Sequence, residues 1–296
     1  MRVADIAYRL RVHGGAACPE RRPIFGFVVQ HLGQFSLSNR PALVRDSSLD
    51  RGPGIQLVVA GSPASISGLK TGDVLLRIGD VTPPVEEGLD RELDQKAAQG
   101  YRDRVDELFE QKARSGPIEL QVLREGRIVA VRVTAVSGCP SRVHLARSGQ
   151  RNAYADGTHV FITTQLLHTA ANDDEVAFVI AHEMAHNILH HAANLHALGI
   201  SHGKGRGTGR SGQAVIKKSE READVLGAQL VRAAGFDPVK GAEVLRRVGG
   251  SIFGILGSGT HDSSSARISA IRRYVTSQLP NSGTRGDTGE RGTGTP

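Results

Sequence analysis

The chain has 296 residues, with 37 Lys+Arg against 30 Asp+Glu for a formal net charge of +7, and it contains two Cys and no Trp. This length allows two modest domains, and an apolar content of 39% is typical of folded chains, so a small stapled module and a largely disordered protein are both excluded. The basic residues form no dense block with interleaved aromatic residues. We therefore expect no nucleic-acid partner, and an RNA- or DNA-binding role for Lys204, Arg206 and Arg210 has only their charge to support it.

No export signal or membrane span is expected from the residues. Asp5, Arg9 and Arg11 interrupt the N-terminal segment, where a signal peptide needs an apolar run of about 7–15 residues. The longest apolar stretch is interrupted between His182 and His186, well short of the roughly 18 residues that a spanning helix requires. A cytoplasmic location would follow if Met1 is the true start.

Residues 23–137 are predicted to form a β-rich module, preceded by an N-terminal segment, residues 1–22. Short apolar runs bounded by turn residues indicate strands at 26–30, 55–60, 74–78, 118–123 and 128–133. Two helices are expected between them, at about Pro63–Leu69 and Asp103–Arg114.

The string GSPASISGLKTGDVLLRIGDVTP, residues 61–83, resembles the signature of PDZ domains. That resemblance implies that Phe25, Gly26 and Phe27 form the loop that binds a peptide carboxylate, and that the next strand pairs with an extended peptide. PDZ ligand peptides are then expected partners. A long insertion, residues 31–53, is expected to cover or reshape the peptide groove, and a small β domain without a ligand is the alternative.

Cys18 precedes this module and Cys139 follows it. Neither cysteine belongs to a CxxC pair, so a cysteine-built zinc site is excluded. A bridge between them would tie off the module and imply an oxidising compartment. The composition leaves open whether they are bridged.

Residues 138–280 are predicted to form a mainly helical domain, followed by a disordered Gly/Thr-rich tail, residues 281–296. Asn172 is a suitable N-cap for a helix that continues to Leu189. A glycine-rich basic loop is expected over Gly199–Gly212. Further helices are expected at about Ser219–Ala234, Pro238–Val248 and Ser265–Gln278.

The segment His182-Glu183-Met184-Ala185-His186 lies in the middle of the capped helix. Residues four apart share a helix face, so both imidazoles can reach one metal ion while Glu183 acts as a general base. Two histidines and a glutamate on an otherwise apolar helix need such a reason. This pattern predicts a zinc hydrolase.

A catalytic zinc site needs a third protein ligand. His190 and His191 are the nearest candidates in sequence, but three ligands on consecutive turns of one straight helix do not close a compact site. The metzincin pattern is excluded because Leu189 and Ala192 occupy its glycine and histidine positions.

Glu220-Arg221-Glu222-Ala223-Asp224 provides the better candidate. HExxH followed by ExxxD resembles the gluzincins, and EREAD specifically resembles the HtpX/Ste24/BepA-type metallopeptidases. The resemblance implies that Glu220 is the third ligand of one Zn²⁺ per chain and that Asp224 hydrogen-bonds a ligating histidine. Glu222 remains the alternative ligand.

The segment Asn152, Ala153, Tyr154, Ala155 resembles the edge strand that borders the zinc helix in this family. An edge strand can bind a substrate peptide by strand addition. Tyr154 is also a candidate for oxyanion stabilisation.

Residues 261–267, HDSSSAR, resemble the family's HPxxxxR motif, with Asp262 in place of proline. By this resemblance His261 approaches the zinc or the oxyanion, and Arg267 pairs with a nearby acidic group.

The fold class we expect is therefore α+β, with a PDZ-like β module followed by a mainly helical zincin domain that has a small edge-strand sheet. The expected function is a zinc-dependent metalloendopeptidase that acts on unfolded or misfolded envelope proteins in protein quality control, because soluble relatives act in the bacterial cell envelope. The alternative is a PDZ-led binding or chaperone-like protein with a latent or structural zinc site.

Overall fold

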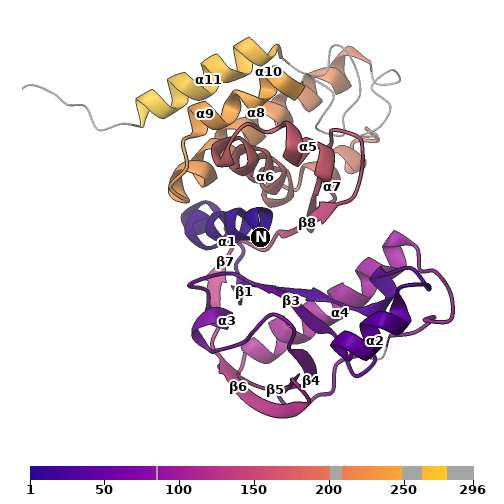
Figure 1. Ribbon diagram of the computed structural model, residues 1–296. Coiled ribbons are helices and arrows are strands. Elements are labelled where there is room, and N and C mark those ends of the chain that lie inside the picture. The colour runs from indigo at the N-terminus through magenta and orange to yellow at the C-terminus, as the bar shows by residue number, and fades with distance from the viewer. Residues whose placement is uncertain (85, 201–208, 249–261, 279–296) are drawn as a thin grey trace, which may run out of the picture.

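The computed structural model describes residues 1–84, 86–200, 209–248 and 262–278 of the chain. Over these residues it shows a mixed α+β protein, as expected, with a sheet-rich module beside a mainly helical one (Figure 1). The tail predicted to be disordered, residues 281–296, lies outside the described residues.

The sheet-rich module is a five-stranded antiparallel sheet in the order β2-β3-β4-β5-β6, with a separate β1-β7 pair at its base. Its elements are β1 (Arg22–Ile24), β2 (Phe27–Gln30), η2 (Leu32–Gln34), α2 (Arg40–Ser47), β3 (Gly54–Val58), α3 (Pro63–Ile66), β4 (Val74–Ile78), α4 (Gln95–Ala113), β5 (Ile118–Arg124), β6 (Arg127–Val133) and β7 (Val136–Gly138). The five predicted strands are confirmed, with ends that differ by at most two residues.

The core of this module lies between the sheet and α4. Strand β5 alternates buried and exposed residues, as expected for a strand with one face against a core. Val105 and Phe109 of α4 are buried against that face. Helix α4 begins eight residues before the predicted start because Asp94 caps it, accepting a hydrogen bond from the Ala97 amide at 2.7 Å.

The insertion between β2 and β3 folds as η2 and α2 and packs around its own small apolar cluster. Leu32 and Leu49 of the insertion are buried there together with Val74 of β4. This position explains how the long insertion is accommodated without disturbing the sheet.

The helical module surrounds α6 (Figure 1). Its elements are α1 (Arg2–His13), η1 (Gly14–Ala17), β8 (Arg142–Ala146), β9 (Ala153–Ala155), β10 (His159–Thr163), α5 (Thr164–Thr169), α6 (Asp173–Ile188), α7 (His191–Ala197), α8 (Arg210–Ala233), α9 (Pro238–Ala242), α10 (Val244–Val248) and α11 (Ser264–Ser277). Strand β10 pairs in parallel with β8 and antiparallel with β9, which leaves β9 at one edge of this three-stranded sheet.

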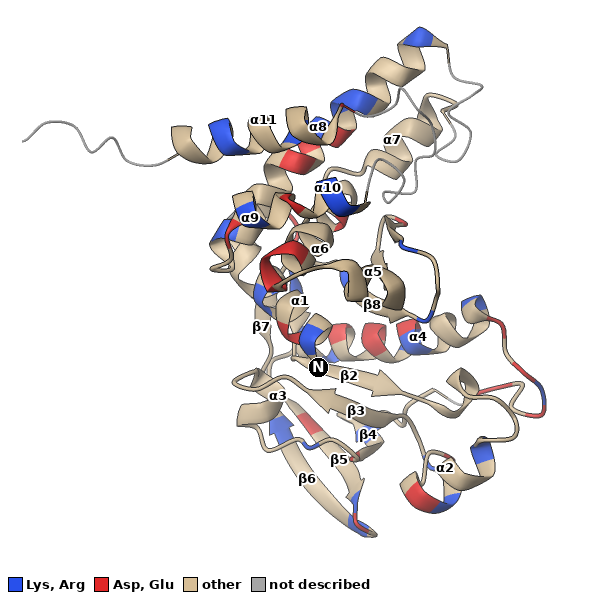
Figure 2. Ribbon diagram, turned by 45° about the horizontal axis from the view of Figure 1, so that its top comes forward, with Lys and Arg blue, Asp and Glu red and all other residues tan. Residues whose placement is uncertain are grey.

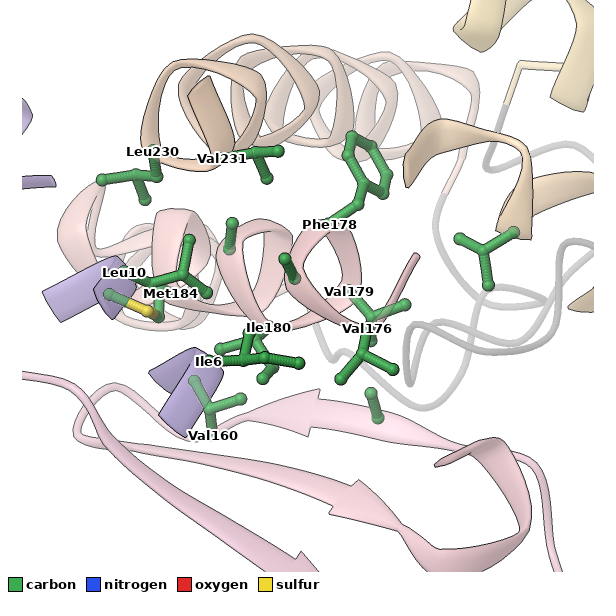
Figure 3. Close-up of a cluster of buried hydrophobic side chains, with 14 of the residues drawn as sticks. Ile6, Leu10, Val160, Val176, Phe178, Val179, Ile180, Met184, Leu230 and Val231 are labelled. Carbon is green, nitrogen blue, oxygen red and sulfur yellow. The ribbon is translucent and has the colours of Figure 1, made fainter. Parts of the chain in front are cut away.

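Figure 3 shows α6 packed between α8 on one side and the sheet with α1 on the other. Every α6 residue from Glu175 to Ile188 is buried. The predicted capping is confirmed, since Asn172 accepts a hydrogen bond from the Glu175 amide at 2.9 Å. Burial on all sides is what an apolar helix without a polar face requires.

In the helical module, two predicted helices differ from the structure. Helix α8 starts at Arg210, inside the predicted glycine-rich loop, of which residues 201–208 lie outside the described part of the chain. The predicted helix over Pro238–Val248 is two short helices, α9 and α10. Tertiary contacts explain the first difference, because Ile216 in the added turns is buried against Leu195 of α7.

The N-terminal helix α1 belongs to the core of the helical module. Its residues Ile6 and Leu10 are buried against α6 (Figure 3). Cys18 and Cys139 form a disulfide in the same core, next to the β1-β7 pair through which the chain enters and leaves the sheet-rich module. The bridge thus closes the base of that module, the arrangement that the sequence had left open.

A charged network joins the two modules. Arg142 of β8 lies 3.1 Å from Asp103 and 2.9 Å from Glu110, both on α4. Figure 2 shows the acidic bands of α4 next to β8. Beside them, the His144 ring contacts Arg102 of α4 at 3.0 Å. The module interface is therefore polar, and it aligns α4 with the small sheet.

Within the described part of the chain, no helix is long and apolar enough to cross a membrane.

Replacing both Cys18 and Cys139 by Ser should lower the free energy of unfolding by about 2–5 kcal/mol, because the bridge closes a loop of 121 residues in the unfolded chain. Chemical denaturation of the variant and of the oxidised parent measures the difference. The variant should also lose the sensitivity of unfolding to reductant. Equal midpoints for the parent with and without reductant would contradict the bridge.

Candidate metal centre

Helix α6 places the HExxH residues at the centre of the module. His182, Glu183 and His186 are all buried, and the 3.6-residue period brings the two histidines onto one face. Their Nε2 atoms lie 3.1 Å apart. One cation can therefore contact both imidazoles.

Helix α8 supplies the carboxylate that completes this face. The Glu220 oxygens lie 3.4 Å from Nε2 of His182 and 3.4 Å from Nε2 of His186. Gly227, further along α8, permits this close approach, since a Cβ atom there would lie 3.1 Å from the His182 amide nitrogen. His182, His186 and Glu220 are accordingly a buried group that can hold a metal ion.

Asp224 and Arg267 lie behind His182. An Asp224 oxygen is 3.2 Å from Nδ1 of His182, the nitrogen that faces away from Glu220. Arg267 of α11 binds the same carboxylate through two hydrogen bonds, at 2.8 and 2.6 Å. Arg267 thus lies against an acidic group in the structure.

The carboxylates around His182 favour a positive charge on its ring. Burial alone would lower the pKa of His182, but its contacts with Asp224 and Glu220 outweigh burial and raise the pKa to about 9. Burial would likewise raise the pKa of Asp224, yet Arg267 and His182 lower it. Asp224 thus favours its ionised form, and together with the nearby Glu220 it favours a positive charge at His182.

Glu183 is buried and its Oε1 atom has no hydrogen-bond partner among the described residues. Burial raises its pKa to about 7, with Glu220 adding to the effect and with His182 and Arg267 opposing it. A buried carboxyl group without a partner is costly for stability. A group that titrates near neutrality is suited to take up and release a proton.

The two histidines that follow α6 lie in different environments. The helix ends at Ile188, and His190 adopts a left-handed conformation with φ of 53°, which starts α7 in a new direction. His190 is exposed and does not continue the helix face. His191 is buried, and its Nδ1 atom lies 3.0 Å from Nδ1 of His186.

Glu222, the alternative ligand, lies away from the converging donors. Its carboxylate is 3.4 Å from Nε2 of His191 and its side chain is 47% exposed. Glu220 is therefore the carboxylate that the structure brings to the two histidines. The contacts of His191 had no signal in the sequence, because they depend on the turn at His190.

Strand β9 is the edge strand beside α6, in the place that the sequence predicted. Ala153 is buried against α6, whereas Tyr154 points to the opposite face and stacks on Phe161 with ring centroids 4.8 Å apart. The alternation of a strand thus directs Tyr154 away from the zinc-helix side. The oxyanion role of Tyr154 stays a prediction. Asn152, the first residue of the segment, donates a hydrogen bond from its backbone amide to the Thr163 hydroxyl at 3.0 Å.

The second oxyanion candidate, His261, lies outside the described residues. Asp262, in the position of the missing proline, pairs with Arg221 of α8 at 2.6 Å. This ion pair fixes the start of the segment that leads to Arg267.

The predicted carboxylate loop lies between β1 and β2. Gly26 has φ of +79°, and a Cβ atom there would lie 2.2 Å from Cβ of Ser62, so the loop requires glycine. The loop borders a cavity of about 120 Å³ that is also lined by Tyr8 of α1 and His144 of β8. None of the residues of the insertion, 31–53, lines this cavity.

In a comparison with known protein families, the model of Peptidase family M48 matches residues 120–202. No curated protein sequence matches the chain. The matched segment includes His182, Glu183 and His186 but ends before Glu220, whose place beside the two histidines comes from the geometry described above. The match supports an M48 metallopeptidase family for the segment that carries the HExxH helix.

Proposed function

We propose that the chain is a zinc metalloendopeptidase of the HtpX/Ste24/BepA type. The observation that carries this proposal is the convergence of His182, His186 and Glu220 beside the buried Glu183. The family match supports peptidase chemistry, and the geometry supplies the residues for it.

The donor set suits zinc. Two imidazole nitrogens and one carboxylate are ligands that zinc accepts, and catalytic zinc sites commonly have three protein ligands and one open position. A bound zinc ion supplies a Lewis acid that polarises a carbonyl group and acidifies water. One such ion per chain is consistent with the single cluster among the described residues.

The chain's own residues perform the remaining steps. Glu183 takes the proton of the attacking water and returns it to the leaving amine, a role that suits a pKa near 7. Asp224, itself held by Arg267, fixes the tautomer of His182 so that Nε2 is free of a proton on the donor side. Both roles require that Glu183 and Asp224 are buried, because solvent would weaken their electrostatic interactions with the neighbouring groups.

Strand β9 orients the substrate. Among the strands of the described residues it pairs with β10 alone, which leaves its other edge unpaired there, and it borders α6. An extended polypeptide added at this edge would run beside the zinc helix with its backbone held by hydrogen bonds. Unfolded or misfolded proteins, the substrate class of a quality-control protease, can supply such segments.

The sheet-rich module is proposed to select substrates as a PDZ domain. Its support is the loop at Gly26, the adjacent strand β2, and a cavity that both modules line. A peptide bound there would be held next to the peptidase module, which raises its local concentration.

The proposed location is the cell envelope. The disulfide between Cys18 and Cys139 supports an oxidising compartment, since such bridges are rare where thiols are kept reduced.

A Glu183→Gln variant should bind zinc like the parent and lose about 100- to 10,000-fold in kcat for cleavage of an unfolded protein such as casein. The loss should follow from the missing proton acceptor. Because the proposed reaction also needs zinc, a chelator should abolish the parent's activity. Glu119→Gln, at an exposed glutamate of β5, is the matched control and should retain activity. Undiminished cleavage by Glu183→Gln would remove Glu183 from the mechanism. A parent that binds zinc without chelator-sensitive cleavage would favour the binding or chaperone-like alternative.

A Glu220→Ala variant should lose the bound metal, because two histidines alone are too few ligands for tight zinc binding. Metal analysis after dialysis should give well below one zinc per chain. Glu222→Ala, assayed at saturating zinc, should still bind one equivalent. The reverse pattern would make Glu222 the third ligand.

Peptides with a free C-terminal carboxylate should bind the full-length Glu183→Gln protein at least about 10-fold more tightly than the same peptides with an amidated C-terminus, because charged hydrogen bonds in the loop are lost. Fluorescence anisotropy with labelled apolar peptides measures this ratio. Equal affinities of the two forms would argue against a PDZ carboxylate loop at Gly26.

A further inference from the structure

His186 contacts a second histidine on the side away from the converging donors. Its Nε2 atom faces His182 and Glu220, while its Nδ1 atom lies 3.0 Å from Nδ1 of His191. The other nitrogen of His191, Nε2, lies 3.4 Å from the Glu222 carboxylate. These contacts form a continuous series from Glu222 of α8 through His191 of α7 to His186 of α6.

Hydrogen-bond chemistry decides which atom donates and which accepts at each contact of this series. An ionised carboxylate only accepts, so Glu222 favours the His191 tautomer that carries its proton on Nε2. Nδ1 of His191 is then an acceptor, and it can accept the proton on Nδ1 of His186. The result is a His186 ring whose Nε2 lone pair is directed at the metal position.

We propose that His191 and Glu222 form a positioning relay that fixes the tautomer and the ring orientation of the metal ligand His186. This inference rests on the proposed zinc site. It assigns Glu222 a role that differs from that of a ligand, and it assigns His191 a role although His191 is not one of the three converging donors. Both are positioning residues, since they act on the metal through His186.

The two ligating histidines are thereby supported in different ways. His182 contacts the carboxylate of Asp224 directly, whereas His186 reaches the carboxylate of Glu222 through the intervening ring of His191. All three acidic residues of the EREAD segment thus serve one centre: Glu220 at the metal, Asp224 behind His182 and Glu222 behind His191.

The local backbone explains why His191 reaches this position. His190 is left-handed, so the chain turns sharply after α6 and α7 starts at His191. Leu195, one turn along α7, is buried against Ile216 of α8 and anchors the helix. Packing of α7 on α8 therefore holds His191 between His186 and Glu222.

The test is the zinc affinity of full-length variants, measured by competition with a chromogenic chelator. His191→Ala should bind zinc about 10–100-fold more weakly than the parent, the usual effect of removing such a support. Glu222→Ala should weaken binding less, because its exposed carboxylate can be replaced by water. His191→Gln should regain part of the affinity, since its amide oxygen can accept the same proton.

Two control variants separate the relay from general effects on the helices. Lys218→Ala removes the 3.8 Å ion pair between Lys218 and Glu222 without touching His191. His196→Ala removes an exposed histidine from the same helix as His191. Both controls should bind zinc like the parent.

A double variant, His191→Ala with Glu222→Ala, gives the decisive outcome. Its zinc affinity should equal that of His191→Ala alone, because Glu222 acts only through His191. Additive losses, or parent-like affinity in His191→Ala, would overturn the relay. The absorption spectrum of bound Co²⁺ should also change in His191→Ala and remain unchanged in Lys218→Ala. A parent that binds no zinc would overturn the proposed function together with the relay, whereas the other negative outcomes overturn the relay alone.

Discussion

Helices α6 and α8 approach so closely that Glu220 of one comes within 3.4 Å of His182 and His186 of the other. The approach depends on Gly227, because a side chain at that position would meet the backbone of α6 at His182. A metal ion held by side chains from two helices would require a fixed spacing between those helices, since coordination distances tolerate shifts of only a few tenths of an ångström. The remaining features of the centre follow from this contact between the helices.

Burial of several ionisable groups in one place is unfavourable unless each has a partner of opposite charge. The centre meets this requirement through successive contacts. Arg267 binds Asp224, Asp224 faces His182, and the carboxylates of Asp224 and Glu220 raise the pKa of His182. Glu183 differs from these groups, because its Oε1 atom has no partner among the described residues and its pKa is near 7. These contacts stabilise the charged groups and leave the Glu183 carboxyl group poorly stabilised, and perturbed pKa values of this kind are common at functional sites.

The two modules are connected at more than one point. The disulfide joins the strands of chain that enter and leave the sheet-rich module, and Arg142 connects β8 to the acidic face of α4. The cavity at the Gly26 loop is lined from both sides of this interface. The Gly26 loop and strand β9 therefore belong to modules that are held together by several contacts.

Local sequence determined the five strands of the sheet-rich module, the capped helix α6 and the HExxH face, because these depend on alternation, capping and the helical period. Glu220, Asp224 and Arg267 were identified by resemblance, and their contacts now explain why those residue types are needed. Tertiary structure alone decided the turn at His190, the contact of His191 with His186 and Glu222, and the direction of Tyr154. The physical reason is that each of these depends on which helix or strand packs against which, and no periodicity within a single segment records that choice.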